Sequence, residues 1–149
     1  MGETHSGRPR KITGLAVLWF FLGLWNAWSA LQGINADLSN WHLLSEPTVS
    51  GWFKTAGPVE LCANFALLAI FILILLAALG LFTGKRWSYK LTLAAGTISA
   101  FLYFVLGALY LSAPPEIYKN LGAAIVQELG LGVFQIALVI VSWRYLTAR

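Results

Sequence analysis

Charged residues are scarce in this sequence. Asp, Glu, Lys and Arg make up 11% of its 149 residues, whereas hydrophobic residues make up 58%. An ordinary soluble domain is about 25% charged and about 45–50% apolar. Because so few polar side chains cannot cover a water-facing surface, the composition excludes a soluble globular protein, a disordered chain and a nucleic-acid-binding module. The expected partner is therefore the lipid bilayer and not a nucleic acid.

Residues that bind metals or carry out catalysis are also few. The only cysteine, Cys62, cannot form a disulfide within the chain, and His5 and His42 lack a second ligand at metal-binding spacing. The sequence contains no phosphate-binding loop, no Gly-x-Ser-x-Gly elbow and no Cys-x-x-Cys pair. We therefore expect no metal, no haem or other cofactor and no catalytic residues, and we favour a non-enzymatic protein.

Long hydrophobic runs are what the sequence does contain. A membrane-spanning helix needs about 20 mostly apolar residues, and four segments qualify, at about 12–33, 59–83, 89–113 and 121–145. Gly84 and the pair Pro114-Pro115 separate the later segments, and Pro58 suits the first turn of the second helix. The sequence predicts an all-α polytopic membrane protein, a single domain over residues 1–149 that forms an antiparallel bundle of four transmembrane helices.

Two targeting patterns occur in the N-terminal region. Basic residues, an apolar core and Trp28-Ser29-Ala30 resemble a signal peptide with its cleavage site. We expect a retained first span instead, because the apolar stretch is long and rich in aromatic residues, and cleavage is the alternative. Residues 1–6, Met-Gly-Glu-Thr-His-Ser, match the N-myristoylation pattern, which we interpret as a chance match because the pattern is permissive.

Lysine and arginine are unevenly distributed about the spans, which predicts the orientation. Eight cations fall on one side: Arg8, Arg10, Lys11, Lys85, Arg86, Lys90, Arg144 and Arg149. The other side has Lys54, Lys119 and five of the six acidic residues. The positive-inside rule therefore places both termini, with the basic tail 1–11, in the cytoplasm. We expect a multi-pass protein of the cell (inner) membrane.

The longest connection, about 34–56, is predicted on the outer side. Its apolar residues are too many for free solution: Trp41, Leu43, Leu44, Trp52 and Phe53. We expect this loop to lie at the membrane interface as a short helix or lid. It would either cap a site or shield the ends of the helices.

Small and polar residues recur at helical spacing within the spans. Those of the third span are Thr92, Gly96, Ser99, Tyr103, Gly107 and Tyr110. Such residues allow close backbone approach and hydrogen bonds between helices, so we expect each stripe to face the interior of the bundle. Gly80 and Gly84 form a Gly-x-x-x-Gly pair, for which we favour packing within the chain over dimerisation.

The strongly polar side chains of the spans converge in the outer half. Glu128 is the most informative, because an acidic residue at a helix centre costs about 2.5–3.5 kcal/mol on insertion scales. The residues of the candidate ligand or proton pocket are Glu128, Gln135, Asn26, Asn64, Tyr103 and Glu60. One hypothesis is a polar pocket, open outward, in which Glu128 exchanges a proton. The other is a structural cluster in which a protonated Glu128 bonds to an amide or a tyrosine.

Three short segments carry a resemblance to known families. Residues 79–87, Leu-Gly-Leu-Phe-Thr-Gly-Lys-Arg-Trp, form the expected inner turn, and Arg8-Pro9-Arg10 leads into the first span. In these features the chain resembles uncharacterised small four-span prokaryotic membrane proteins with a Gly-Lys/Arg-x-Trp inner turn, which implies the fold and no assigned activity. Residues 52–58, Trp-Phe-Lys-Thr-Ala-Gly-Pro, are more weakly similar to the DoxX-like family. That resemblance implies a link with quinone-coupled oxidoreductase assemblies.

These observations favour a non-enzymatic integral membrane protein, either an accessory or scaffold subunit or a small binding protein. One alternative is a small proton-coupled carrier that uses Glu128. A second alternative is a DoxX-like, quinone-linked oxidoreductase partner. Beyond lipid, the expected partners are other membrane subunits or further copies of the chain.

Overall fold

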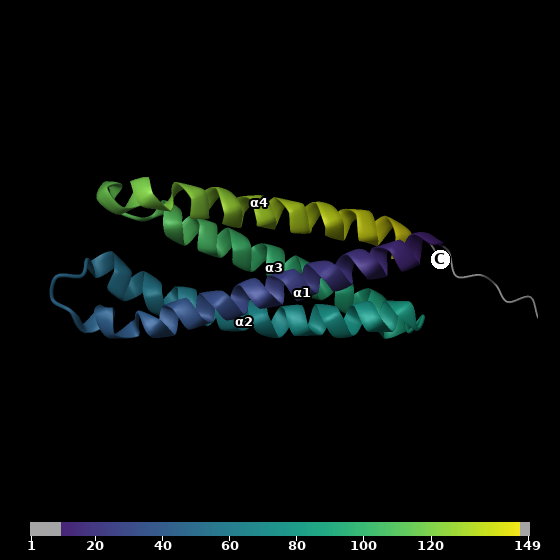
Figure 1. Ribbon diagram of the computed structural model, residues 1–149. Helices are drawn as coiled ribbons and strands as arrows, with labels where there is room; N and C mark the ends of the chain where they lie inside the picture. The colour runs from purple at the N-terminus through teal and green to yellow at the C-terminus, as the bar shows by residue number, and fades with distance from the viewer. Residues whose placement is uncertain (1–9, 147–149) are drawn as a thin grey trace, which may run out of the picture.

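The computed structural model describes residues 10–146, which form an all-helical structure, as predicted (Figure 1). Its elements are α1 (Arg10–Ser39), the short 3₁₀ helix η1 (Trp41–Ser45), α2 (Gly51–Phe82), α3 (Arg86–Leu111) and α4 (Pro115–Leu146). Arg8, Arg149 and the myristoylation pattern at 1–6 lie outside the described residues.

Within residues 11–146, four helices are long and apolar enough to cross a membrane. They contain 26 to 32 residues each, which is about 39–48 Å at 1.5 Å per residue. The hydrocarbon core of a bilayer is about 30 Å thick. The helices cover most of the four predicted segments, and three of the four extend several residues beyond one end of the predicted segment. Helices of this length can tilt in the bilayer or reach beyond its hydrocarbon core.

The predicted loop at 34–56 is wrong at both ends. α1 continues to Ser39, and only residues 40–50 connect it to α2. Ile34 is 7% exposed, so the first helix keeps an apolar contact beyond the point where the hydrophobic run ends. Tertiary contacts such as this one hold α1 helical through a polar segment that hydropathy alone assigns to a loop.

The start of α2 also differs from the prediction. The Ser50 side chain accepts a hydrogen bond from the backbone N–H of Trp52, at 3.2 Å, and so caps the helix before Gly51. Pro58 therefore lies inside α2 and not in its first turn. A proline there lacks the N–H that the carbonyl of Lys54 would otherwise accept.

The tight turn between α2 and α3 depends on Gly84. This glycine has a φ of 74°, a left-handed conformation that side chains with a Cβ disfavour. The N–H of Lys85 donates to the carbonyl of Gly80 at 2.9 Å, and that of Gly84 donates to Leu81. The pair of bonds ends α2 in a Schellman motif and returns the chain directly into α3.

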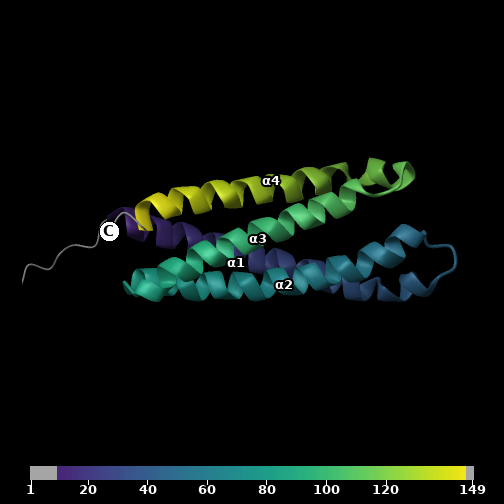
Figure 2. The same ribbon diagram turned by 180° about the vertical axis from the view of Figure 1, so that it is seen from behind.

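The four helices lie side by side as two pairs, α1 with α2 and α3 with α4 (Figures 1 and 2). α2 also packs along α3, whereas α1 and α4 touch only sparsely. One end of the bundle contains the start of α1, the 83–85 turn and the end of α4, and we call it the basic end. At the other end, the loop end, which holds η1 and residues 112–114, the two pairs diverge.

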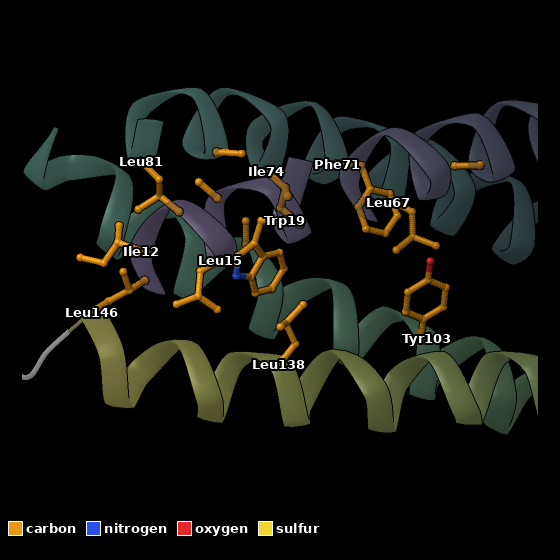
Figure 3. Close-up of a cluster of buried hydrophobic side chains, with 14 of the residues drawn as sticks. Ile12, Leu15, Trp19, Leu67, Phe71, Ile74, Leu81, Tyr103, Leu138 and Leu146 are labelled. Atoms are coloured by element: carbon orange, nitrogen blue, oxygen red, sulfur yellow. The ribbon is translucent and has the colours of Figure 1, made fainter. Parts of the chain in front are cut away.

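A continuous apolar core fills the basic end (Figure 3). Ile12, Leu15 and Trp19 of α1 are buried against Leu138 and Leu146 of α4. The indole N–H of Trp19 donates to the hydroxyl of Ser142 at 2.9 Å. These contacts join α1 to α4 at this end.

The stripes of small residues face the interior, as predicted. All six residues of the α3 stripe are buried, from Thr92 to Tyr110. A Cβ on Gly96 would come 2.6 Å from the Trp19 ring, and a Cβ on Gly80 would come 2.6 Å from the Cβ of Ser88. Gly80 thus serves packing within the chain. Large apolar side chains remain exposed on the outer surface, including Trp25 at 69% and Val126 at 73%.

We predict that Gly96→Ala destabilises the protein, because the new methyl group would push Trp19 and Val139 apart. Overpacking of this kind costs about 1–3 kcal/mol, and each kcal/mol lowers the melting temperature by about 2–4 °C in a chain of this size. Thermal unfolding in detergent measures the change. Gly130→Ala is the matched control, since nothing lies within 4 Å of a Cβ there. Equal melting temperatures for the two variants would contradict this packing.

Candidate functional site

A polar cavity of about 170 Å³ lies between the helix pairs, toward the loop end, and all four helices line it. Of the six residues predicted for the pocket, five line this cavity: Asn26, Glu60, Asn64, Tyr103 and Glu128. Helical spacing therefore identified a set of side chains that the fold brings together from four separate segments.

Gln135 is the predicted residue that does not line the cavity. It lies two turns beyond Glu128 on the same face of α4, and it is fully buried. Neither its amide nitrogen nor its amide oxygen has a hydrogen-bond partner among the described residues. The divergence of the helix pairs leaves room around Glu128 but not around Gln135.

Hydrogen bonds tie α1 to α3 on one wall of the cavity. The phenol of Tyr103 donates to the amide oxygen of Asn26 at 2.8 Å. The amide nitrogen of Asn26 in turn donates to the backbone carbonyl of Leu22 at 2.9 Å. Asn26 is 1% exposed and Tyr103 is 4% exposed, so both side chains are buried and hydrogen-bonded in this wall.

A second set of hydrogen bonds holds α2 to its neighbours. The phenol of Tyr110 donates to a carboxylate oxygen of Glu60, and the amide of Asn64 donates to Asp37 at 3.0 Å. Tyr110 and Asp37 were not among the predicted pocket residues. Tyr110 belongs to the α3 stripe, and Asp37 was assigned to the loop because α1 was predicted to end too early.

Glu128 differs from Glu60 in having an unsatisfied oxygen. Its Oε2 is buried and has no hydrogen-bond partner among residues 10–146. The hypothesis of a fully satisfied cluster around Glu128 therefore does not describe this structure, in which tyrosine bonds to Glu60 instead. Glu60 interacts electrostatically with both Asp37 and Glu128. Among the described residues, no lysine, arginine or histidine lines the cavity.

A second pocket, of about 220 Å³, adjoins the cavity at the loop end. Asp37 and Glu60 line it together with Trp41 and Leu44, which both belong to η1. Because Glu60 lines both spaces, it stands between them. The connection between α1 and α2 thus forms one wall of a pocket that Asp37 and Glu60 also line.

The polar cavity reaches the surface between α1 and α4. Ser29 of α1 and Gln127 of α4 are its exposed lining residues. Two contacts join α1 to α4 at the basic end. One is the hydrogen bond between Trp19 and Ser142. In the other, the Lys11 amine lies 5.3 Å from the centre of the Tyr145 ring. α1 and α4 are therefore joined at one end and separated by the cavity toward the other.

The cavity is lined by carboxylate, amide and phenol side chains. Over residues 10–146, no group of three or more His, Cys, Asp or Glu side chains could hold a metal ion. Cys62 is exposed on α2 and does not line the cavity. What the site offers is carboxylates, amides and phenols, which hold polar ligands or protons. Comparison of the chain with models of protein families, with curated proteins and with solved structures finds no match.

We predict that Gln135→Met raises the melting temperature. Methionine keeps the volume of the side chain and removes two buried polar groups without partners, each of which costs about 1–3 kcal/mol. Thermal unfolding in detergent should show an increase of about 2 °C or more. Ser142→Ala serves as the comparison, because it breaks the bond from Trp19 and should lower the melting temperature. A Gln135→Met variant as unstable as Ser142→Ala would show that Gln135 has a partner.

Proposed function

We propose that the chain is a multi-pass protein of the cell (inner) membrane, in which α1 to α4 cross the bilayer as an antiparallel bundle. Four apolar helices of sufficient length support this proposal. At the basic end lie Lys11, Lys85, Arg86, Lys90 and Arg144, whereas Lys54 and Lys119 lie near the loop end. Because such residues favour the cytoplasmic side, the basic end would lie in the cytoplasm with both termini, and the loop end would lie outside.

We infer that the protein is non-enzymatic and binds a small, positively charged ligand in the polar cavity. The observation that carries this proposal is the buried Oε2 of Glu128, which has no partner among the described residues although the cavity brings four helices around it. A buried carboxylate without a partner is costly. A bound cation would supply the partner that the protein itself does not.

The hydrogen bonds of the cavity favour a ligand that donates. Tyr103, Tyr110, Asn26 and Asn64 each already donate a hydrogen bond to another protein group. On the acceptor side, Oε2 of the Glu128 carboxylate receives no hydrogen bond from the described residues. An ammonium group has a positive charge and several N–H donors, and the tyrosine rings can add cation–π attraction. A volume of 170 Å³ corresponds to about five or six water molecules, which suits a small amine.

A proton-coupled carrier that uses Glu128 is the second candidate function. The position of Gln135 supports this candidate. Gln135 is another buried polar side chain without a partner among the described residues. It lies on the same face of α4 as Glu128 and nearer the basic end. Beyond it lie the buried pair Trp19 and Ser142. Polar groups thus continue past the cavity, as a path through the bundle would require.

An accessory or scaffold role is compatible with ligand binding and rests on a different surface. Phe21, Trp25 and Trp28 are exposed on successive turns of α1, at 63%, 69% and 59%. Such rings pack against lipid or against another subunit. The likeness to small four-span prokaryotic proteins and to DoxX-like, quinone-linked partners stays a prediction.

The ligand proposal predicts that ethylammonium stabilises the purified protein and that Glu128→Gln abolishes the effect. A ligand at 100 times its dissociation constant stabilises the folded state by about 2.7 kcal/mol, which is a rise of about 5–10 °C in melting temperature. Glutamine keeps the shape of the side chain and removes its charge. Without ethylammonium, the variant should melt within a few degrees of the wild type.

Glu116→Gln is the matched control, because Glu116 is an exposed acid on the same helix outside the cavity, and it should keep the full response. Acetate and glucose at the same concentration test charge and size. A response to neither ethylammonium nor these solutes would overturn the binding proposal. Vesicles loaded with a pH-sensitive dye distinguish the carrier from a protein that only binds the ligand. When ethylammonium is added, only a carrier changes the internal pH in a way that depends on Glu128.

A further inference from the structure

A groove of about 680 Å³ lies between α3 and α4 at the basic end, well separated from the polar cavity. Arg86 and Lys90 of α3 line it together with Trp143 and Leu146 of α4. Its volume is within the range of about 300–1,000 Å³ that is typical of ligand sites. The groove combines two cations with an apolar floor, and no acidic residue lines it among those described.

We propose that this basic groove binds an anionic phospholipid, with the phosphate at Arg86 and Lys90 and an acyl chain along Leu93 and Leu146. Both cations lie in the first turns of α3, which begins at Arg86, so the positive end of the helix dipole adds to their attraction for a phosphate. Basic pockets between helices on the cytoplasmic side are suited to anionic head groups.

The apolar part of the groove argues for a lipid over a soluble phosphate. Leu93, Leu146 and the ring of Trp143 line it beside the cations, and Trp143 is 59% exposed. Gly84, which has no side chain, lines the groove where it meets the 83–85 turn. A free anion would use only the cationic part, whereas a phospholipid at the membrane interface would cover both parts. This proposal does not depend on the ligand of the polar cavity.

The test measures the melting temperature of the full chain in detergent against phosphatidylglycerol and against phosphatidylcholine with the same acyl chains. We expect phosphatidylglycerol to raise it by several degrees and phosphatidylcholine to leave it unchanged. Arg86→Gln and Lys90→Gln should each weaken the apparent affinity about fivefold, since a basic residue near the lipid contributes about 1 kcal/mol. Two single variants keep the test open if one of them fails to fold.

Lys85→Gln is the matched control, because Lys85 directly precedes Arg86 and is exposed but does not line the groove. The Lys85 side chain also makes no capping hydrogen bond at the start of α3. It should respond like the wild type. An equal loss in Lys85→Gln would show attraction to the whole basic end and overturn the site. Equal stabilisation by phosphatidylcholine would overturn the anionic head group. Binding of glycerol 3-phosphate as tight as that of phosphatidylglycerol would overturn the role of the acyl chain.

Discussion

A polar group in a low-dielectric environment needs a partner, and this constraint organises the whole bundle. Each helix turns its small and polar stripe inward and leaves large apolar side chains outside. At the basic end, the stripes allow such close packing that Trp19 fits against Gly96 and bonds to Ser142. Toward the loop end, Tyr103 bonds to Asn26 and so extends the same principle to bulkier residues. The helix pairs diverge toward this end, and the cavity lies between them.

The polar residues around the cavity satisfy one another only in part. Two carboxylates, Asp37 and Glu60, receive hydrogen bonds from Asn64 and Tyr110. Glu128 has one buried oxygen that receives none within the described part of the chain. Glu60 and Glu128 line the cavity and interact electrostatically, and no described lysine, arginine or histidine lines it. In the function that we propose, a bound ammonium group would supply the partner that the Glu128 carboxylate lacks among the described residues.

Much of this arrangement follows from the sequence, because helical periodicity is a local property. The α3 stripe and the convergence of Asn26, Asn64, Tyr103 and Glu128 could be predicted from spacing alone. The end of α1 could not, because Ile34 gains its burial only from the folded partner. That error also concealed Asp37. The choice of Glu60 over Glu128 as the partner of Tyr110 depends on how two helices are rotated against each other, which no spacing within a single helix reveals.

In the function that we propose, an acidic cavity opens between α1 and α4 and admits a cation. The most direct measurement is the modification rate of Ser29→Cys in a Cys62→Ala protein, in vesicles, by methanethiosulfonate reagents of opposite charge. Ser29 lines the exposed rim of the cavity, and Ser45→Cys on η1 gives the reference ratio of the two rates. We expect the ratio of the cationic to the anionic rate at Ser29→Cys to exceed the reference ratio at least about tenfold. We also expect Glu128→Gln to reduce this preference. Equal ratios at both positions, or no reaction at Ser29→Cys with either reagent, would contradict it.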